Sequence, residues 1–139
     1  MADSELLGHV LVPVANADDA TKTAQALEPY DPERVTALHV VEKGGGAPDK
    51  TPVEQSREVA RESFTTFRTV FPDAEDETAY ATDVIDGILA AAENVDATAI
   101  AFRSRGGNRL LQFLSGDRSI KLVTKADRPV IALPRVQTD

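Results

Sequence analysis

Residues 97–133 constrain the fold of this chain most strongly. They read as an apolar strand, A-T-A-I-A-F, followed by the loop R-S-R-G-G, a helix start at G-D-R-S, and a second apolar strand, P-V-I-A-L. A strand that leads through a glycine-containing loop into a helix is typical of α/β proteins, which present the backbone N–H groups of such helices to phosphates. The segment therefore predicts an α/β fold and directs the search for a site to residues 103–119.

The spacing of two glycines links this segment to a known family. Gly106 and Gly116 are separated by nine residues, and K-L-V-T-K-A-D-R-P-V-I-A-L follows them. This pattern resembles the C-terminal half of the universal stress protein family, and V-L-V-P-V and L-H-V-V extend the resemblance over nearly the whole chain. The resemblance implies one domain over residues 1–139. It also implies a three-layer, doubly wound sheet of five parallel strands in the order 3-2-1-4-5, in an adenine nucleotide alpha hydrolase-like or flavodoxin-like arrangement.

Three positions depart from the pattern of the nucleotide-binding members of that family. Those members have G-x-x-G, nine residues, and then Gly followed by Ser or Thr. Here Arg103 stands where the first glycine belongs, and Asp117 stands where the hydroxyl residue belongs. Ala15 stands where the first strand usually ends in an Asp that contacts the nucleotide base. The resemblance therefore implies the family fold with a degenerate nucleotide-binding motif.

The altered positions are expected at the crevice between the first and fourth strands, because ligands of parallel sheets bind at the carboxyl ends of the strands. An Arg side chain at the first motif position fills or crosses the space that glycine leaves for a phosphate. An Asp at the helix start repels a second anion, by roughly 1 to 4 kcal/mol at about 4 Å. The candidate nucleotide- or anion-binding residues come from the strand ends and the glycine loop: Pro13, Val14, Ala15, Val40, Phe102, Arg103, Arg105, Gly106, Gly116, Asp117, Arg118 and Ser119.

Two hypotheses and a plainer alternative account for these residues. In the first, Asp117 caps the helix and pairs with Arg103 or Arg105, which closes the site to ATP and leaves a regulatory module without a cofactor. In the second, Arg103, Arg105 and Arg118 clamp a nucleotide or another phosphate-bearing anion, with ATP or AMP as candidate cofactors. In the plainer alternative, Asp117 is only an N-cap. No nucleophile with a positioned base, metal cluster or acid/base pair is recognisable, so we expect neither catalysis nor a metal.

The composition limits the class of partner. The 139 residues include 23 acidic and 15 basic side chains, which give a net charge of -8, and no cysteine. This charge argues against nucleic acid as a partner, since a phosphate backbone requires a basic surface. No apolar run is long enough to cross a membrane, and M-A-D-S-E has no features of a secretory signal. We therefore expect a cytoplasmic protein without a membrane or nucleic-acid partner.

The charged residues are unevenly distributed. The acidic residues are rich in Asp and the basic ones are mostly Arg, which fits either a salt-adapted source or an ordinary acidic bacterial protein. Residues 103–128 carry seven basic side chains against two acidic ones. This basic region either marks an anion site or reflects the ordinary preference of Lys and Arg for loops and helix C-terminal turns.

Apolar runs and capping residues predict the other elements. Short apolar runs indicate buried strands, and a capping residue followed by apolar residues at helical spacing indicates a helix. Strands are expected at 9–14, 35–41 and 130–133 and before Thr82, and helices after Asn16, from the capping box at 51–54, and after Asp83.

Some polar side chains in these elements have both a structural and a functional interpretation. His39 lies in the second strand without a second ligand at metal spacing, and is expected to be a packed histidine. Asp83 and Asp86 are three residues apart, as in metal or acid/base pairs, but a first helical turn explains them as capping residues.

The sequence also predicts the burial of apolar side chains outside the central strands. Phe64, Phe67 and Phe71 are expected in the core. Tyr80 is expected to be at least partly buried, and Ile120 and Val123 to face inward from the last helix. Prolines on both sides of the last strand are typical of an edge strand. In the family that the chain resembles, this strand pairs with its mate across a two-fold axis, so the resemblance implies a homodimer through Val130 to Leu133.

Overall fold

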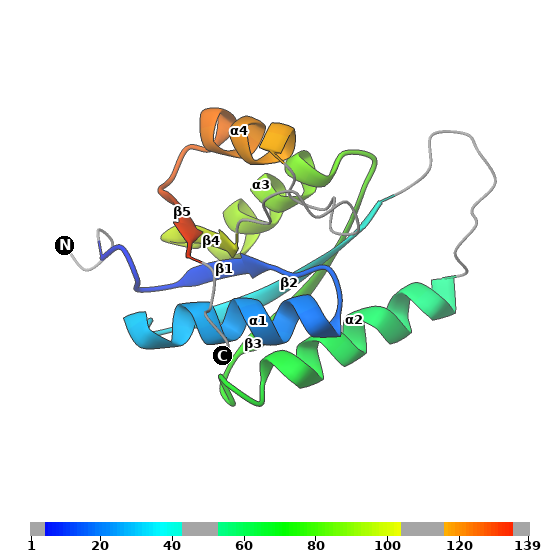
Figure 1. Ribbon diagram of the computed structural model, residues 1–139. Helices are drawn as coiled ribbons and strands as arrows, with labels where there is room; N and C mark the ends of the chain where they lie inside the picture. Colours follow the sequence, from blue (N-terminus) through cyan, green and yellow to red (C-terminus); the bar gives the residue numbers. More distant parts are fainter. Residues whose placement is uncertain (1–4, 43–52, 104–115, 135–139) are drawn as a thin grey trace.

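The computed structural model describes residues 5–42, 53–103 and 116–134, and these ranges contain five strands and four α-helices (Figure 1). Strands and helices alternate along the chain, as the sequence predicts for an α/β protein. The elements are β1 (Val10–Pro13), α1 (Ala17–Leu27), the 3-10 turn η2 (Glu28–Tyr30), β2 (Val35–Glu42), α2 (Val53–Phe67), β3 (Glu75–Ala81), α3 (Val84–Val95), β4 (Ala99–Arg103), α4 (Gly116–Lys125) and β5 (Val130–Leu133).

The five strands form one parallel sheet in the order β3-β2-β1-β4-β5. This confirms the α/β class and the strand order that the resemblance implies. Helices α1 and α2 cover one face of the sheet, and α3 and α4 cover the other (Figure 1). The chain proceeds from β1 to β2 in one direction and later to β4 on the opposite side of β1. The strand order therefore reverses between β1 and β4, where ligands of such sheets bind.

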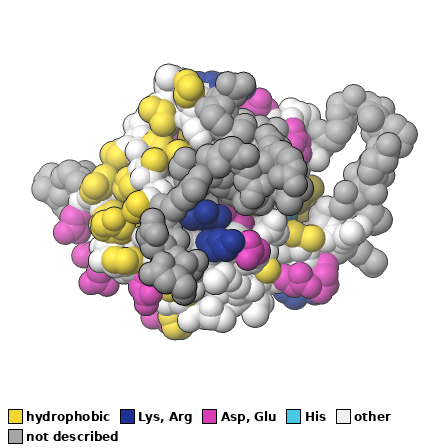
Figure 2. Space-filling view, in the orientation of Figure 1, with side chains coloured by type: hydrophobic (Ala, Val, Ile, Leu, Met, Phe, Trp, Pro, Cys, Tyr) yellow, Lys and Arg dark blue, Asp and Glu magenta, His cyan; other side chains and the backbone are white. Residues whose placement is uncertain are grey.

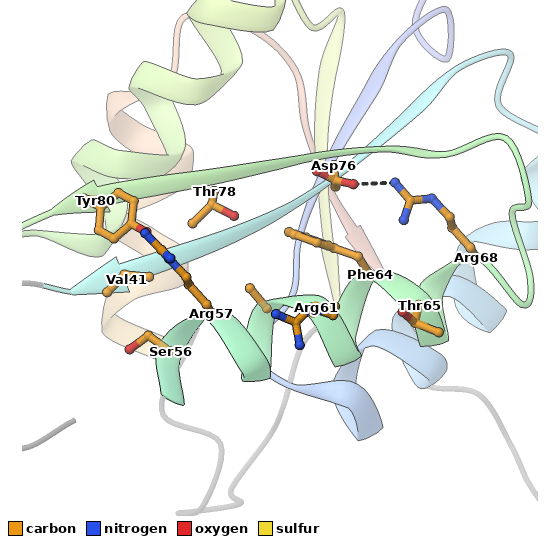
Figure 3. A pocket seen from close by; sticks show the side chains of 11 residues that line it. Val41, Ser56, Arg57, Arg61, Phe64, Thr65, Arg68, Asp76, Thr78 and Tyr80 are labelled. Carbon is orange, nitrogen blue, oxygen red and sulfur yellow. Dashed lines mark hydrogen bonds and ion pairs between the residues drawn. The ribbon is translucent and has the colours of Figure 1, made fainter. Parts of the chain in front are cut away.

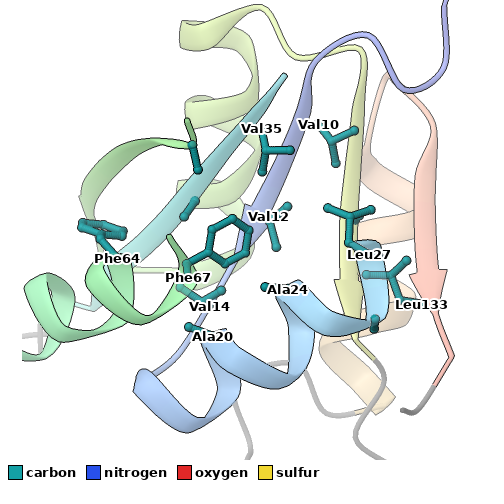
Figure 4. Close-up of a cluster of buried hydrophobic side chains, with 14 of the residues drawn as sticks. Val10, Val12, Val14, Ala20, Ala24, Leu27, Val35, Phe64, Phe67 and Leu133 are labelled. Carbon is teal, nitrogen blue, oxygen red and sulfur yellow. The ribbon is translucent and has the colours of Figure 1, made fainter. Parts of the chain in front are cut away.

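The core under α1 and α2 is built from alternate residues of the central strands. Val10, Val12 and Val14 point to this side, and the ring of Phe67 is fully buried beside them (Figure 4). Phe64 is also buried, which confirms the prediction for these two rings, and Phe71, beyond the end of α2, is partly buried against the same core. Burial of side chains of this size contributes about 1.5 to 3 kcal/mol each.

The core under α3 and α4 uses the other set of alternating residues. Leu11 and Leu38 point to this side and pack with Ile85 and Ile88 of α3. Helix α3 lies close to the sheet at Gly87, where an added Cβ would lie 3.1 Å from both Val40 Cγ1 and Ala81 Cβ. A glycine at this point therefore permits the close approach of helix and sheet.

Two expectations about burial are wrong. Ile120 is 65% exposed and Val123 is 56% exposed, whereas Leu122 is fully buried and packs in the core. The apolar residues Ile120 and Val123 of α4 therefore form an exposed surface and do not face the core. Tyr80 is 49% exposed, because β3 is an edge strand in the described sheet and its side chains lie at the border of the helix layer.

The caps of α1 and α3 are confirmed. Asn16 Oδ1 accepts a hydrogen bond of 2.8 Å from the Asp19 N–H, and Asp83 Oδ1 accepts one of 3.1 Å from the Asp86 N–H. Strand β5 lies at the opposite edge of the sheet from β3, as its flanking prolines predict. The capping box at 51–54 falls largely outside the described residues. No helix in the described ranges is both long and apolar enough to span a bilayer.

Candidate functional site

The crevice between β1 and β4 is bordered by the turn that follows β1 and by the last residue of β4. Strand pairing continues past Pro13, since the Val14 N–H donates a 2.8 Å hydrogen bond to the Leu38 carbonyl. The chain then turns at Ala15 and enters α1 at its cap, Asn16. Arg103 ends β4 and pairs in register with Leu133 of β5. The ends of β1 and β4 thus meet at the start of α1, as the strand order requires.

Asp19 organises this end of the crevice. It lies in the first turn of α1, and its side chain is fully buried. Its Oδ2 atom accepts a 2.7 Å hydrogen bond from the Ala15 N–H, and its Oδ1 atom accepts one of 3.3 Å from the hydroxyl of Thr23. A carboxylate that binds the turn before its own helix fixes the path of the chain from β1 into α1.

Arg103 supplies the charge that balances Asp19. Its Nη2 atom lies 3.3 Å from Asp19 Oδ1, and the exposed fractions of the two side chains are 9% and 0%. Arg103 Nε is also buried, and it makes no hydrogen bond within the described part of the chain. The guanidinium is therefore desolvated and paired with a carboxylate at Nη2, while its Nε donor is not used by that pair. Buried charges of this kind are stable only as a pair, since either one alone would pay the full cost of desolvation.

The predicted site residues divide between the two faces of the sheet. Val14 and the Arg103 guanidinium belong to the α1 side, whereas Val40 and Phe102 are buried on the α3 side. The structure thus brings the strand ends together at one edge, with Val40 and Phe102 serving as core. Arg105 and Gly106 lie outside the described residues.

The helix start that the glycine loop leads into is described only in part. Gly116 is the first residue of α4, but the side chains of Asp117 and Arg118 lie outside the described residues, and Ser119 is half-buried in the first turn. The predicted pairing of Asp117 with Arg103 or Arg105 therefore stays a prediction. The carboxylate that the structure places on Arg103 is that of Asp19.

Asp19 is the residue that the sequence analysis missed. It shares the first helical turn with Asp18, where an acidic residue is expected to complement the helix dipole. The available signal was its position three residues after the cap Asn16, where an acidic side chain reaches back to the chain before the helix. That position distinguishes it from Asp18, whose carboxylate is 70% exposed and pairs with Lys22.

The basic side chains described between residues 103 and 128 already have partners. Lys121 Nζ lies 2.9 Å from Asp83 Oδ2, and Lys125 Nζ lies 3.0 Å from Asp86 Oδ1. Arg128 donates hydrogen bonds of 2.9 and 2.7 Å to the carbonyl oxygens of Ala92 and Ala97. These contacts attach α4 and β5 to α3, so these members of the basic region have a structural role.

The pair between Asp83 and Lys121 also lowers the pKa of the Asp83 carboxyl. The hydrogen bond from Lys121, together with the Asp86 N–H, lowers the pKa of the Asp83 carboxyl from 3.8 to about 2. Asp83 therefore remains ionised over the whole physiological range and holds the middle of α4 against the start of α3. The interpretation of Asp83 as a capping residue is confirmed, and the ion pair is an additional role.

The two histidines are structural in the described part of the chain. His39 is buried, and burial lowers its pKa from 6.5, although a hydrogen bond with the Val14 backbone acts in the opposite direction. Its Nδ1 atom has no hydrogen-bond partner. His9 Nε2 lies 2.7 Å from the hydroxyl of Thr36, and burial likewise lowers its pKa. The expectation of a packed His39 is confirmed.

Comparisons with known proteins identify the family of the chain. The profile of the universal stress protein family matches residues 7–134. Among solved structures, a universal stress protein from Archaeoglobus fulgidus is 22% identical, with a TM-score of 0.64 and coverage of 91% of this chain and 98% of that one. The Archaeoglobus fulgidus protein in complex with dAMP is 23% identical, with a TM-score of 0.62 and coverage of 93% and 99%.

A more distant structure has the same fold. A universal stress protein family protein from Arabidopsis thaliana with AMP bound is 15% identical, with a TM-score of 0.54 and coverage of 93% and 92%. No significant match was found among curated protein sequences. The structural likeness supports the fold, and the family profile covers nearly the whole sequence. The chain belongs to the universal stress protein family.

Proposed function

We propose that this protein is a regulatory universal stress protein that acts as a homodimer and does not bind ATP tightly. The observation that carries the proposal is the buried ion pair between Asp19 and Arg103 at the ends of β1 and β4. In this chain an internal carboxylate holds the guanidinium at the position where nucleotide-binding relatives have their first motif glycine. A regulatory protein of this kind acts through its surfaces, and its crevice serves as part of the core.

The energetics of the ion pair support a closed crevice. A triphosphate bound at Arg103 would either take the guanidinium from Asp19 or lie beside the Asp19 carboxylate. The first case breaks a buried ion pair, which costs about 3 to 5 kcal/mol. The second brings like charges together in a poorly solvated site. Ala15 adds to this effect, because its N–H is already bound to Asp19 and its side chain offers no acceptor.

Restoring the family pattern tests whether the ion pair is what closes the site. The variant Ala15→Asp, Asp19→Asn, Arg103→Gly, Asp117→Ser is expected to gain micromolar ATP affinity in isothermal titration calorimetry. The matched control, Ala15→Asp with Asp117→Ser, keeps the ion pair and is expected to bind no better than the unmodified protein. A folded fourfold variant that still binds no ATP would contradict closure by the ion pair.

Features at the β5 edge support the homodimer. Strand β5 is the last strand of the described sheet, and Ala132 is exposed on it. The exposed Ile120 and Val123 of neighbouring α4 add apolar surface, and Figure 2 shows hydrophobic side chains gathered on the side of the molecule where Figure 1 has β5 and α4. A charged residue on this edge should prevent strand pairing between two copies.

Sedimentation velocity tests the dimer directly. The unmodified protein is expected to sediment as twice its 14.9 kDa chain mass. Ala132→Glu is expected to shift it to the monomer, whereas Tyr30→Glu, at an exposed aromatic of η2, is expected to leave the dimer intact. A monomeric unmodified protein, or an Ala132→Glu variant that remains dimeric, would contradict the proposed interface.

A second candidate function keeps a ligand in the crevice. The free donor at Arg103 Nε favours it, since a buried unpaired N–H is costly and a small phosphate-bearing anion could accept from it. Arg103, Arg105 and the loop between Gly106 and Gly116 would then hold a nucleotide or another phosphate ester. Thermal shifts measured with AMP, ATP and inorganic phosphate separate the two functions, because a closed crevice predicts no shift with any of them.

We further propose a non-catalytic role in the cytoplasm. The charged groups that the structure describes at the crevice are committed to a salt bridge, which leaves neither of them in position to activate water or a hydroxyl group. Incubation with ATP is therefore expected to release no inorganic phosphate above the buffer control, and phosphate release that depends on the protein would contradict this.

A further inference from the structure

A groove of about 310 Å³ lies between α2 and β3, away from the crevice (Figure 3). One side is formed by α2, which contributes Arg57 and Arg61, with Arg68 just beyond its end, and the other by β3, which contributes Thr78 and Tyr80. The buried ring of Phe64 lies between them. The groove therefore combines an apolar floor with a rim of guanidinium groups.

The charge of this groove is opposite to that of the whole protein. Three arginines line it against one acidic residue, Asp76, although the chain carries a net charge of -8. Arg68 is engaged by Asp76, and Arg61 Nη1 lies 2.5 Å from Glu58 Oε1. Arg57 makes no hydrogen bond or ion pair with any residue that the structure describes, and Figure 3 shows it extending from α2 in the direction of Tyr80. The groove thus offers a free cation to an acidic ligand.

The edge of the sheet beside the groove has a charged half and a neutral half. The acidic residues of β3 are in its first half, where Glu75 pairs with Arg34 and Glu77 accepts a hydrogen bond from Asn94. Charged side chains of this kind discourage pairing with another strand. The second half, residues 78–81, reads T-A-Y-A and carries no charge. An added strand is therefore directed to the half that lies beside Arg57 and the exposed ring of Tyr80.

We propose that this groove binds an extended acidic peptide segment of a partner protein. The segment pairs with the outer edge of β3 at residues 78–81 and directs its carboxylates toward Arg57 and Arg61. Backbone pairing at a sheet edge supplies affinity, and the pockets for alternate side chains supply specificity. The apolar floor at Phe64 and the Tyr80 ring receive the apolar side chains that alternate with the acidic ones. A nucleic acid does not fit this mode of binding, because it has no peptide backbone to pair with the edge of β3.

Fluorescence anisotropy with a defined probe tests the proposal on the full chain. The probe is a labelled octapeptide in which Glu or Asp alternates with Val, and its control has Lys at every acidic position. The acidic peptide is expected to bind at least about tenfold more tightly than the basic one, and more weakly at high salt. Arg57→Gln is expected to weaken binding about fivefold to tenfold, the effect of losing one charge-assisted hydrogen bond.

A matched variant controls for the change in net charge. Lys22→Gln also removes one positive charge from an exposed position, on α1 and outside the groove, and is expected to leave peptide affinity within about twofold. Since Arg57 is exposed, its substitution should not alter folding, which a thermal melt of each variant verifies. Equal binding of the acidic and basic peptides, or equal effects of the two substitutions, would overturn the proposal.

Hydrogen exchange distinguishes strand addition from simple charge attraction. Saturation with the acidic peptide is expected to slow exchange of backbone amides in residues 78–81. Peptide binding without slower exchange in this half of β3 would overturn the strand addition. A second copy of the chain is the other ligand that the groove could bind. Sedimentation velocity of the Arg57→Gln variant without peptide tests this alternative. A change in its oligomeric state would identify the groove as a self-interface and overturn the proposal.

Discussion

Asp19 and Arg103, 84 residues apart in sequence, form a buried ion pair at the ends of β1 and β4, with Arg103 Nη2 at 3.3 Å from Asp19 Oδ1. The contact connects the first turn of α1 to the last residue of β4 across the point where the strand order reverses. In this sheet type that point is the usual position of a ligand. Here the protein supplies both the anion and the cation from its own chain.

The ion pair is expected to contribute strongly to stability. Arg103→Met removes one partner of this buried ion pair, and should lower the free energy of unfolding by about 3 to 5 kcal/mol in urea titrations. Arg34→Met, which breaks an ion pair whose side chains are 58% and 52% exposed, should cost less than about 1 kcal/mol. Similar losses in the two variants would contradict a structural role for the buried pair.

Acid should break the ion pair between Asp83 and Lys121. Because the pKa of Asp83 is lowered from 3.8 to about 2, its pair with Lys121 stabilises the fold above about pH 4 and is lost as the pH falls toward 2. In Lys121→Met the pKa of this carboxyl is expected to rise toward its ordinary value, as measured by carbon NMR of the side-chain carboxyl. Lys22→Met is the control, and an unchanged pKa in Lys121→Met would contradict the assignment.

The buried histidines should make the protein less stable in weak acid. Burial lowers the pKa of His39 from 6.5, so the folded state favours the neutral ring. The stability that this confers is complete above pH 6.5 and declines as the pH falls below that value, because the unfolded chain then binds the proton first. The free energy of unfolding should therefore decrease as the pH is lowered from about 7.5 to 5. The decrease should be smaller in the His39→Gln variant. Equal slopes would refute this role of His39.

Gly87 should be sensitive to a single added methyl group. An alanine Cβ there would lie 3.1 Å from Val40 Cγ1 and from Ala81 Cβ, and both neighbours belong to the sheet. Gly87→Ala should lower the melting temperature, with a loss of about 1 to 2 kcal/mol after the gain in helix propensity. Gly8→Ala, whose nearest neighbour atom would be 3.4 Å away, should change stability by less than about 0.5 kcal/mol. Equal melting temperatures would contradict the close approach.

Much of the fold could be predicted from the sequence because local signals agree with the tertiary structure. The alternating apolar residues of β1 and the caps at Asn16 and Asp83 are short-range patterns, and the structure confirms them. The outward face of α4 could not be predicted in this way. Ile120 and Val123 are at helical spacing, and spacing alone does not distinguish a core contact from an exposed apolar surface.

The candidate site could be located from the sequence, but its chemistry could not. The motif spacing points to the ends of the strands at Ala15 and Arg103, and the structure places both there. The partner of Arg103 comes from α1, far away in sequence, and only the packing of that helix on the sheet selects Asp19 over the adjacent Asp18. Pairing between residues so far apart in sequence depends on tertiary packing, which a local sequence pattern does not reveal.

Isothermal titration calorimetry of the unmodified 139-residue chain with ATP, and then with AMP, tests the central claim most directly. If the salt bridge between α1 and β4 replaces a bound nucleotide, neither titration gives a saturable heat at micromolar concentrations. A saturable micromolar isotherm for either nucleotide, abolished by Arg103→Met, would show that the crevice accepts a ligand and would contradict the account.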